Sequence, residues 1–363
     1  MDPIDVVRAR VASQLARPRA EPAAVVRAFG AVQAQDYRAA LWGIALRTSG
    51  ATEADVERAI AARTIVRTWP MRGTLHFVAP VDVRWMLRLL ARRVIPRAAA
   101  RHRELGLDES VFARARTIFE RALAGDRQLT RPETFALLEA HGIAAAGQRG
   151  VHILGRLAME GVLCFGPHRG KQPTLALLDE WAPAPRQDLD DDEARGELAR
   201  RYLGSHGPAT EADLAWWSGL PLGEARRAIE IARLDLHEEG GWWSGRDAPR
   251  ETGRADRAPR VDLLPPFDEY TVAYRERSAF LDAGLAARTR NGIMSPVVLV
   301  DGRIAGVWSR AHASRGVRLR IELARNVEAP LMRAIEQQVE RFGRFVELPT
   351  TAEITGVGSG ASP

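Results

Sequence analysis

The sequence predicts an α+β fold that is mainly α-helical, with three tandem winged-helix modules followed by a small C-terminal β-barrel. Two observations carry this prediction. Three times along the chain, segments with helical periodicity are followed by β-branched and aromatic residues around a turn signal. After residue 258 the pattern changes to strands, with a tight-hairpin signal at Asp301–Gly302. Three helices and a β-hairpin are the plan of a winged helix, a variant of the helix-turn-helix.

The first module is predicted over residues 1–108. Its helices are expected over 4–15, 22–34 and 37–48, and from 53 onward. Thr52 and Asp55 have the spacing of a capping box at the start of the last of these helices. The segment TIVRTWPMRGTLHFV is predicted to form a β-hairpin, in which Pro70 and Gly73 suit the turn.

The later modules repeat this plan. The second is predicted over 109–183, with helices at 110–124, 131–141 and 147–160 before the hairpin GVLCFGPHRGKQPTLALL. The third is predicted over 190–250, with helices at 191–204, 210–217 and 221–234 before the hairpin DLHEEGGWWSG. The C-terminal domain is predicted over 258–353, with strands in RVDLLPPFDEYTVAY, SPVVLVDGRIAGVWSR and RGVRLRIEL and a helix at 329–342. Residues 354–363 are expected to be a disordered tail.

Composition limits the possible chemistry. Lys and Arg outnumber Asp and Glu by 52 to 46, so the net charge is +6, and a basic surface attracts polyanions such as nucleic acid. Lys171 is the only lysine, so reactions through a lysine Schiff base are disfavoured. The single cysteine, Cys164, excludes internal disulfides, Cys-rich zinc sites and iron–sulfur clusters, and its apolar neighbours predict a buried strand position.

Familiar catalytic motifs do not occur in the sequence. The eight histidines are scattered without an HExxH pair, and there is no GxSxG, P-loop or GxGxxG in a strand-to-helix context. We therefore expect neither a metal nor a cofactor. No apolar run approaches the roughly 20 residues that a membrane span needs, and the charged N-terminus is unlike a signal peptide. A cytoplasmic, monomeric protein is expected.

The stretch AVQAQDYRAALWG, residues 31–43, contains the pair of residues that we single out. Gln33 and Gln35 are two positions apart, so in an extended turn between helices their side chains would point the same way. Asp36 is expected to be the N-cap of the helix that begins at Tyr37. Polar residues in such a turn are ordinary, so composition alone leaves a structural and a chemical role open.

Four longer stretches carry a family resemblance. They are VQAQDYRAALWGIALRT with RTWPMRGTLHFVAP, LEAHGI with RGVHILGRLAMEGVL, RRYLGSHGPATEADLAWWSGL, and LLPPFDEYTVAY with NGIMSPVVLVDGRIAGVW. In this order and over nearly the whole chain, the sequence resembles the AlkZ/YcaQ-type winged-helix DNA glycosylases. The resemblance implies three winged helices and a C-terminal β-barrel. The family's signature is Gln, a hydrophobic residue, then Gln or Asp, which Gln33, Ala34 and Gln35 match in its AlkZ-like version.

The resemblance also implies an activity. AlkZ-type enzymes remove bulky N7-alkylated purines, including interstrand crosslinks, and the partner implied here is double-stranded DNA that carries such bases. N7-alkylation makes the base cationic and weakens its glycosidic bond, so the base leaves without being protonated. The amide carbonyls of Gln33 and Gln35 would then hold a water near C1′ and face the developing positive charge. The enzyme would be monofunctional, without a Schiff base.

Eight residues are predicted to contact DNA. They are Arg72 and His76 in the first hairpin, Arg149, Arg226 and Arg227 on the expected recognition helices, and Arg310, His312 and Arg315 in a basic turn of the C-terminal domain. Because bulky bases are hard to flip into a tight pocket, we expect an open, concave, basic cleft. For His76, packing within the hairpin is an equal alternative.

Two other functions remain open from the sequence. A non-enzymatic winged-helix DNA-binding protein, such as a transcriptional regulator, would use the glutamines structurally and would bind DNA without releasing bases. A protein-interaction scaffold would have no salt-dependent affinity for DNA.

Overall fold

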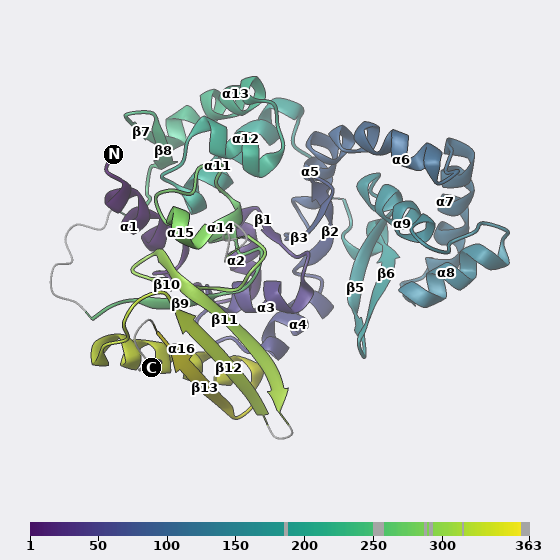
Figure 1. Ribbon diagram of the computed structural model, residues 1–363. Coiled ribbons are helices and arrows are strands. Elements are labelled where there is room, and N and C mark those ends of the chain that lie inside the picture. Colours follow the sequence, from purple (N-terminus) through teal and green to yellow (C-terminus); the bar gives the residue numbers. More distant parts are fainter. Residues whose placement is uncertain (185–187, 250–257, 287–288, 290–292, 314–315, 357–363) are drawn as a thin grey trace.

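A computed structural model describes residues 1–184, 188–249, 258–286, 289, 293–313 and 316–356, apart from the side chains of residues 312 and 313. Figure 1 shows a larger body, formed by the N-terminal, central and C-terminal parts of the chain, with a smaller lobe beside it that contains α7 to α9. The two parts meet along the strands β2 and β5.

The first repeat has the order helix, short strand, two helices and hairpin. It consists of α2 (Pro22–Phe29), β1 (Ala31–Gln33), α3 (Tyr37–Ala45), α4 (Glu53–Ala61), β2 (Val66–Met71) and β3 (Thr74–Val78), preceded by α1 (Pro3–Gln14). The expected capping box at the start of α4 is confirmed, because Thr52 and Asp55 each accept the other's backbone N–H. This repeat is followed by α5 (Val83–Leu89), two 3-10 turns (Ala91–Arg93 and Ile95–Ala98) and α6 (Ala99–Glu104).

The same order recurs twice. The second repeat consists of α7 (Glu109–Leu123), β4 (Leu129–Thr130), α8 (Arg131–Ala140), α9 (Arg149–Met159), β5 (Leu163–Arg169) and β6 (Gln172–Leu177), and α10 (Leu178–Trp181) follows it. The third consists of α11 (Asp191–His206), α12 (Glu211–Ser218), α13 (Leu222–Ala232), a 3-10 turn (Arg233–Asp235), β7 (Leu236–Glu239) and β8 (Trp242–Gly245). In place of a first strand, the third repeat has a single β-bridge between Ala209 and Trp243.

The prediction of a helix over 22–34 was wrong at its end. Gly30 has a φ of 76°, which ends α2 after Phe29. Residues 31–33 then form β1, which pairs antiparallel with β3 so that Gln33 lies opposite His76. The pair of glutamines therefore begins on a strand, and is not contained in an interhelical turn.

The hairpin that follows was predicted correctly, but not all of its turn. Arg72 and Gly73 have positive φ angles of 57° and 74° and form the tip, whereas Pro70 lies inside β2. The turn therefore carries a charged side chain, Arg72, whose role is described below.

A six-stranded sheet joins the first two repeats, with the strand order β1-β3-β2-β5-β6-β4. The two halves meet through the pairing of Arg67 on β2 with Phe165 on β5. One hydrophobic core runs through the first and third repeats and the C-terminal part, and a second core fills the second repeat. Each core also includes residues from the other side of the joint, such as Cys164 and Ala176 in the first core and Leu75 in the second, so the shared sheet packs the two parts together.

The C-terminal part is a mixed sheet in the order β13-β12-β11-β10-β9. Its elements are β9 (Val261–Leu264), α14 (Glu269–Val272), α15 (Ala283–Ala286), β10 (Val297–Val300), β11 (Arg303–Ala313), β12 (Gly316–Leu323), α16 (Ala329–Val346) and β13 (Thr350–Thr355). The predicted tight turn at Asp301–Gly302 is confirmed, with φ angles of 50° and 80°. Among the strands described, no pairing of β9 with β13 closes the sheet into a barrel.

Two details of this part differ from the prediction. Residues 269–272 form the short helix α14 within a segment expected to be strand, because Asp268 caps it by accepting the backbone N–H of Tyr270. Ile354 and Thr355, expected in a disordered tail, lie in β13, which pairs in parallel with β12. Residues 357–363 of that predicted tail lie outside the described residues.

The C-terminal part is fastened to the first repeat close to the glutamines. Trp42 on α3 packs against the rings of Phe342 and Phe345 on α16, with centroids 5.1 and 5.0 Å away. Its indole N–H donates to the carbonyl of Leu263 at 2.7 Å. This contact brings α14 next to β1, which positions the site described next.

Candidate active site

Gln33 and Gln35 lie at the junction between β1 and α3, in different environments. Gln33 is the last residue of β1 and is only 8% exposed, whereas Gln35 is exposed. Asp36 is the N-cap of α3, as predicted, because its carboxylate accepts the backbone N–H of Ala39 at 3.1 Å. Asp36 thus fixes the start of α3 immediately after the two glutamines.

The side-chain carbonyls of both glutamines are held by the β2–β3 hairpin. Arg72 donates from Nη2 to Oε1 of Gln33 at 3.1 Å, and the backbone N–H of Leu75 donates to Oε1 of Gln35 at 3.2 Å. These donors determine which side of each amide is the oxygen. A carbonyl oxygen has two lone pairs, so each glutamine can still accept one hydrogen bond from a water.

The backbone between the glutamines is held by Arg67. Its guanidinium donates twice to the carbonyl of Ala34, from Nε at 3.2 Å and from Nη2 at 2.8 Å. Arg67 is 7% exposed, lies 5.3 and 4.9 Å from the ring centroids of Tyr37 and Phe165, and has no carboxylate partner among the described residues. Burial lowers its pKa to about 10, so it stays charged at neutral pH. The sequence analysis did not identify Arg67. The signal that could have indicated it is a charged residue within the β-branched segment TIVRT, which is predicted to lie in the β-hairpin.

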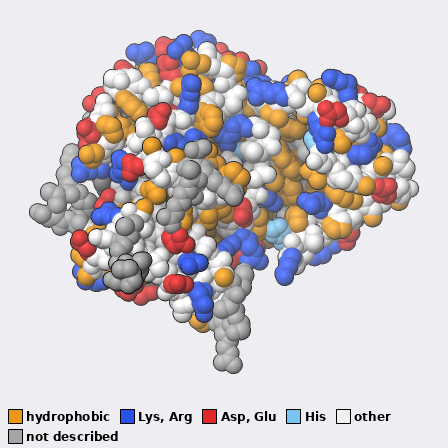
Figure 2. Space-filling model, viewed as in Figure 1, with side chains coloured by type: hydrophobic (Ala, Val, Ile, Leu, Met, Phe, Trp, Pro, Cys, Tyr) orange, Lys and Arg blue, Asp and Glu red, His pale blue; other side chains and the backbone are white. Residues whose placement is uncertain are grey.

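A cleft of about 780 Å³ opens between the first and second repeats beside Gln35. Figure 2 shows a hollow with an apolar surface between the larger body and the smaller lobe. Its basic lining residues are Arg38, Arg67, Arg131 and Lys171, its aromatic ones are Tyr37, Trp69 and Phe165, and Asp36 is the acidic residue among them. A basic cleft with aromatic walls suits the phosphates and base faces of DNA.

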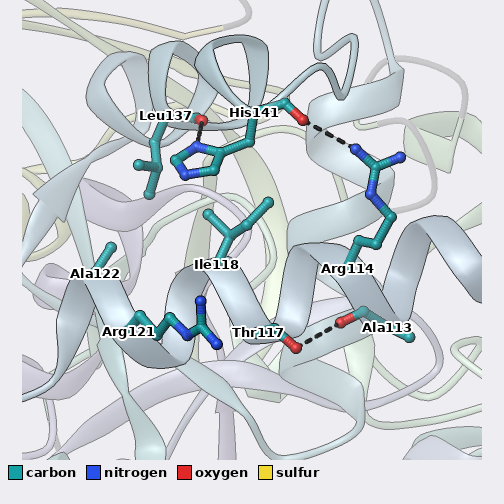
Figure 3. Close-up of a pocket in the computed structure, with 8 residues that line it drawn as sticks. All are labelled: Ala113, Arg114, Thr117, Ile118, Arg121, Ala122, Leu137 and His141. Atoms are coloured by element: carbon teal, nitrogen blue, oxygen red, sulfur yellow. Dashed lines mark hydrogen bonds between the residues drawn. The ribbon is translucent and has the colours of Figure 1, made fainter.

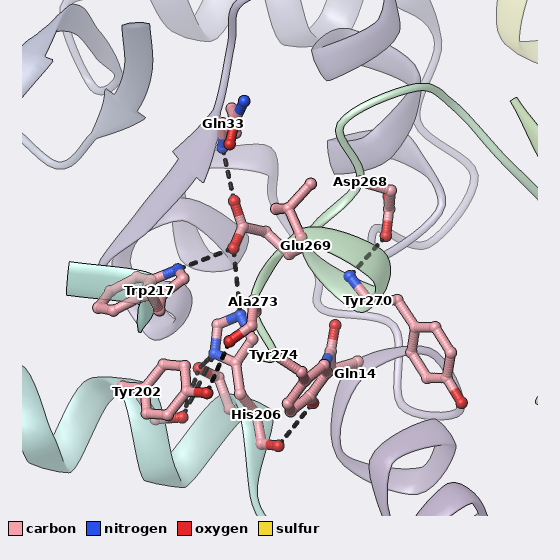
Figure 4. A network of polar contacts seen from close by, with 12 residues as sticks. Gln14, Gln33, Tyr202, His206, Trp217, Asp268, Glu269, Tyr270, Ala273 and Tyr274 are labelled. Carbon is pink, nitrogen blue, oxygen red and sulfur yellow. Dashed lines mark hydrogen bonds and ion pairs between the residues drawn. The ribbon is translucent and has the colours of Figure 1, made fainter. Parts of the chain in front are cut away.

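Gln33 is held from its other side by a buried carboxylate. Oε1 of Glu269 accepts the backbone N–H of Gln33 at 2.6 Å, and Oε2 accepts the indole N–H of Trp217 at 2.9 Å (Figure 4). The ring of His206 approaches Oε2 to 3.3 Å. Glu269, 1% exposed, lies in the segment PPFDEY, and sequence reasoning assigned it no role. Nothing in one sequence indicates that residues 33, 217 and 269 meet.

His76 packs inside the hairpin in this structure. It is fully buried, and its ring lies 3.0 Å from the carbonyl of Thr74 and 3.3 Å from Nη2 of Arg72. A ring that donates to Thr74 and accepts from Arg72 must be neutral. Burial and the nearby Arg72 guanidinium agree with this, because they lower the pKa of His76 to about 3. The position of His76 thus matches the alternative given from the sequence, that it packs within the hairpin.

This neutral histidine predicts a pH dependence of stability. Between the ordinary pKa of 6.5 and about 3, the unfolded chain binds a proton at His76 that the folded protein does not. The free energy of unfolding therefore falls by about 1.4 kcal/mol per pH unit from this group as the pH drops below 6.5. His76→Gln should remove that contribution, so its urea denaturation between pH 6.5 and 4.5 should show a shallower slope than wild type. Equal slopes would contradict the buried neutral state.

Four of the other predicted DNA contacts, Arg149, Arg226, Arg227 and Arg310, are not among the residues that line the cleft. Arg149 donates to the carbonyls of Ala144, Leu105 and Gly106. Arg226 and Arg227, both exposed, pair with Glu211 at 2.6 Å and Asp192 at 3.0 Å. Arg310 is half-buried, 5.9 Å from the ring of Phe342. The His312 side chain and Arg315 lie outside the described residues. Their contact with DNA remains a prediction.

The remaining features offer less for chemistry. A second hollow of about 630 Å³ lies between α7 and α8, and Figure 3 shows Ile118 and Leu137 in its lining together with Arg114, Arg121 and His141. Cys164 is buried in β5, and burial raises the pKa of its thiol. Among the described residues, no cluster of His, Cys, Asp and Glu could hold a metal ion, and no helix has the length and apolar character to cross a membrane.

Comparison with known proteins identifies the family of the chain. The family described as DNA glycosylase AlkZ-like matches residues 26–345. The interstrand DNA cross-link repair glycosylase of Streptomyces sahachiroi is 28% identical over 325 residues, which cover 82% of this chain and 85% of that protein. The solved structure of Streptomyces sahachiroi DNA glycosylase AlkZ aligns with a TM-score of 0.72 and 26% identity over 96% of this chain and 99% of that one. The chain therefore belongs to the AlkZ-like family of DNA glycosylases.

Proposed function

We propose that the protein hydrolyses the N-glycosidic bond of N7-alkylated purines in double-stranded DNA, including bulky and crosslinked ones, with a water held by Gln33 and Gln35. The observation that carries the proposal is the fixed orientation of the two amides, of which Gln35 lines the basic cleft. Arg72 and Leu75 hold the two carbonyl oxygens, and each oxygen keeps a free lone pair. Because the family consists of glycosylases, the regulator and the scaffold are not retained.

The proposed chemistry matches the neutrality of these groups. An N7-alkylpurine already carries the positive charge that makes it a good leaving group, so no general acid is needed. The transition state instead gathers positive charge on the sugar, and preorganised carbonyl dipoles aimed at it are favourable. Undamaged bases are neutral and are therefore poor leaving groups. The weak assistance that two amides give is not enough to release them.

The architecture supports DNA as the substrate. The three repeats have the helix and hairpin order of winged helices, and we propose that each is such a module, over 1–108, 109–183 and 190–250, with the C-terminal sheet over 258–353. A crosslink is a reasonable target because the related Streptomyces sahachiroi protein is described as an interstrand DNA cross-link repair glycosylase. An open cleft accommodates a base that cannot be flipped freely. We propose a monomer that acts in the cytoplasm on chromosomal DNA.

The test is base release by the wild-type protein. Duplexes carrying one N7-methylguanine or one nitrogen-mustard crosslink, and matched undamaged duplexes, are incubated with enzyme and split into samples with and without alkali. We expect strand breaks only in damaged DNA and only after alkali, because water attack leaves an intact abasic site. Breaks before alkali would indicate a lyase. No release from either damaged duplex would overturn the proposed substrate class.

A further inference from the structure

The buried carboxylate behind Gln33 has a place in the reaction that the glutamine motif does not account for. Glu269 is the first residue of α14, and its two oxygens contact elements from different repeats. One oxygen accepts from β1 through the backbone of Gln33, and the other accepts from α12 through Trp217, with His206 of α11 3.3 Å away. Figure 4 shows these residues converging on the one side chain.

The contacts form a closed ring around Gln33. Glu269 joins the backbone of Gln33 to the indole of Trp217, and Arg72 joins the Gln33 side chain to the backbone carbonyl of Trp217 at 2.6 Å. Gln33 is thus held at its backbone by an anion and at its side chain by a cation, both anchored to one tryptophan. A displacement of Glu269 or Arg72 would therefore change the orientation of the Gln33 side-chain carbonyl.

Glu269 itself cannot be the acid or base of the reaction. It is 1% exposed, and both of its oxygens already have donors. Burial would raise its pKa, but the contact with His206 and the N–H of Gln33 outweigh burial and hold the pKa at about 2. The carboxylate is therefore a permanent negative charge that cannot exchange protons with substrate at neutral pH.

This charge also offsets that of Arg72. Burial lowers the pKa of the Arg72 guanidinium, and the negative charge of Glu269 acts in the opposite direction. Removing one member of a buried, charge-balanced group leaves the other without compensation, which is costly. Arg72 would then be drawn away from Oε1 of Gln33 toward solvent.

We propose that Glu269 is a positioning residue of the glycosylase, which aims the Gln33 carbonyl by holding its backbone and by keeping Arg72 on its side chain. The inference rests on the proposed function of Gln33. It assigns the third repeat and α14 a role in catalysis through Trp217 and Glu269, in addition to any role in binding DNA. It also explains why a catalytic amide is found on a strand anchored by distant segments.

The test is a double-mutant cycle with Glu269→Gln and Gln33→Ala, read by single-turnover release of N7-methylguanine with enzyme in excess. We expect Glu269→Gln to slow release by about 10- to 100-fold in the wild-type background, because a reacting group displaced by about 1 Å costs up to roughly 100-fold. In the Gln33→Ala background the same change should have an effect below about threefold, since the group it positions is missing. The Kd for a duplex with an abasic site should change by less than about twofold.

Control variants separate positioning from general structure. Glu197→Gln removes a partly buried carboxylate of the third repeat, paired with Arg200 and Arg201, and should leave the rate unchanged. If Glu269→Gln does not fold, Trp217→Phe removes one donor to the same carboxylate while keeping an aromatic ring, and it is measured in the same cycle.

Two results are decisive. Equal fractional losses from Glu269→Gln, or from Trp217→Phe, in the presence and absence of the Gln33 side chain would overturn the positioning role and leave the proposed function intact. No base release by the wild-type protein would overturn the proposed function itself, before any variant is compared.

Discussion

Replacing Gln35 with alanine should lower the single-turnover rate of N7-methylguanine release by about 100- to 1000-fold, the loss that follows removal of one preorganised polar group aimed at a transition state. Gln35 is exposed beside the cleft, and among the described residues its side chain accepts one hydrogen bond, from the backbone N–H of Leu75. Its loss should therefore remove the carbonyl that we propose holds the water, with little effect on folding. Gln33→Ala should cause a loss of similar size. The double variant should lose less rate than the product of the two single fold-losses, because we propose that both glutamines act on one water.

The matched control is Gln148→Ala. Gln148 is an exposed glutamine before α9 that accepts hydrogen bonds from Arg101, and it does not line the cleft. The Gln148→Ala variant should release N7-methylguanine at the wild-type rate. Gln35→Asp tests the acidic version of the motif, and should retain more activity than Gln35→Ala because a carboxylate also accepts from water. Release by both alanine variants within threefold of wild type would place the catalyst elsewhere.

The second large effect is expected at the ion pair between Arg47 and Asp268. Arg47 follows α3, is 3% exposed, and donates to both oxygens of Asp268, at 2.8 Å from Nη1 and 2.7 Å from Nη2. Asp268 is the N-cap of α14, so the pair joins the first repeat to the helix that carries Glu269. Asp268→Asn keeps a capping side chain but leaves the buried guanidinium without its counter-charge. Breaking one side of such a pair costs about 3–5 kcal/mol.

The measurement is urea denaturation at neutral pH, followed by tryptophan fluorescence, since Trp42 and Trp217 are buried in the same core. The control is Glu340→Gln, which breaks the exposed pair with Arg344 at 3.8 Å. That change should alter the free energy of unfolding by less than about 0.5 kcal/mol. A loss below about 1 kcal/mol in Asp268→Asn would show that the buried pair does not hold α14 against the first repeat.

Local sequence signals were sufficient for much of the fold. The capping box at Thr52, the N-cap at Asp36 and the tight turn at Asp301–Gly302 depend on residues within three positions of each other. Helical periodicity likewise located most helices. These features are determined by short-range hydrogen bonds and by the φ values that particular residues allow. For that reason a single sequence is enough to predict them.

The errors occurred where distant pairing overrides local preference. Residues 31–33 continue an apolar, Ala-rich helical pattern, yet they form β1 because β3 offers a hydrogen-bonding edge 45 residues later, at His76 to Val78. Residues 354 and 355 look like a polar tail, yet they pair with β12. Periodicity also does not encode which strands lie at the edges of a sheet or which strands pair. The C-terminal sheet has β9 and β13 as its edges, and β2 pairs with β5, because of contacts between distant segments.

The candidate site likewise has features that the sequence determines and features that depend on the tertiary structure. The sequence alone determined that Gln33 and Gln35 were the residues to examine, through the Gln-Ala-Gln motif and through the shortage of lysine, cysteine and metal-ligand pairs. Only the tertiary structure decided how Gln33 is held, because its partners Glu269 and Trp217 are 236 and 184 positions away. The physical reason is that buried charges and polar groups require partners, and the chain supplies those partners from any segment that packs nearby, whatever its distance in sequence.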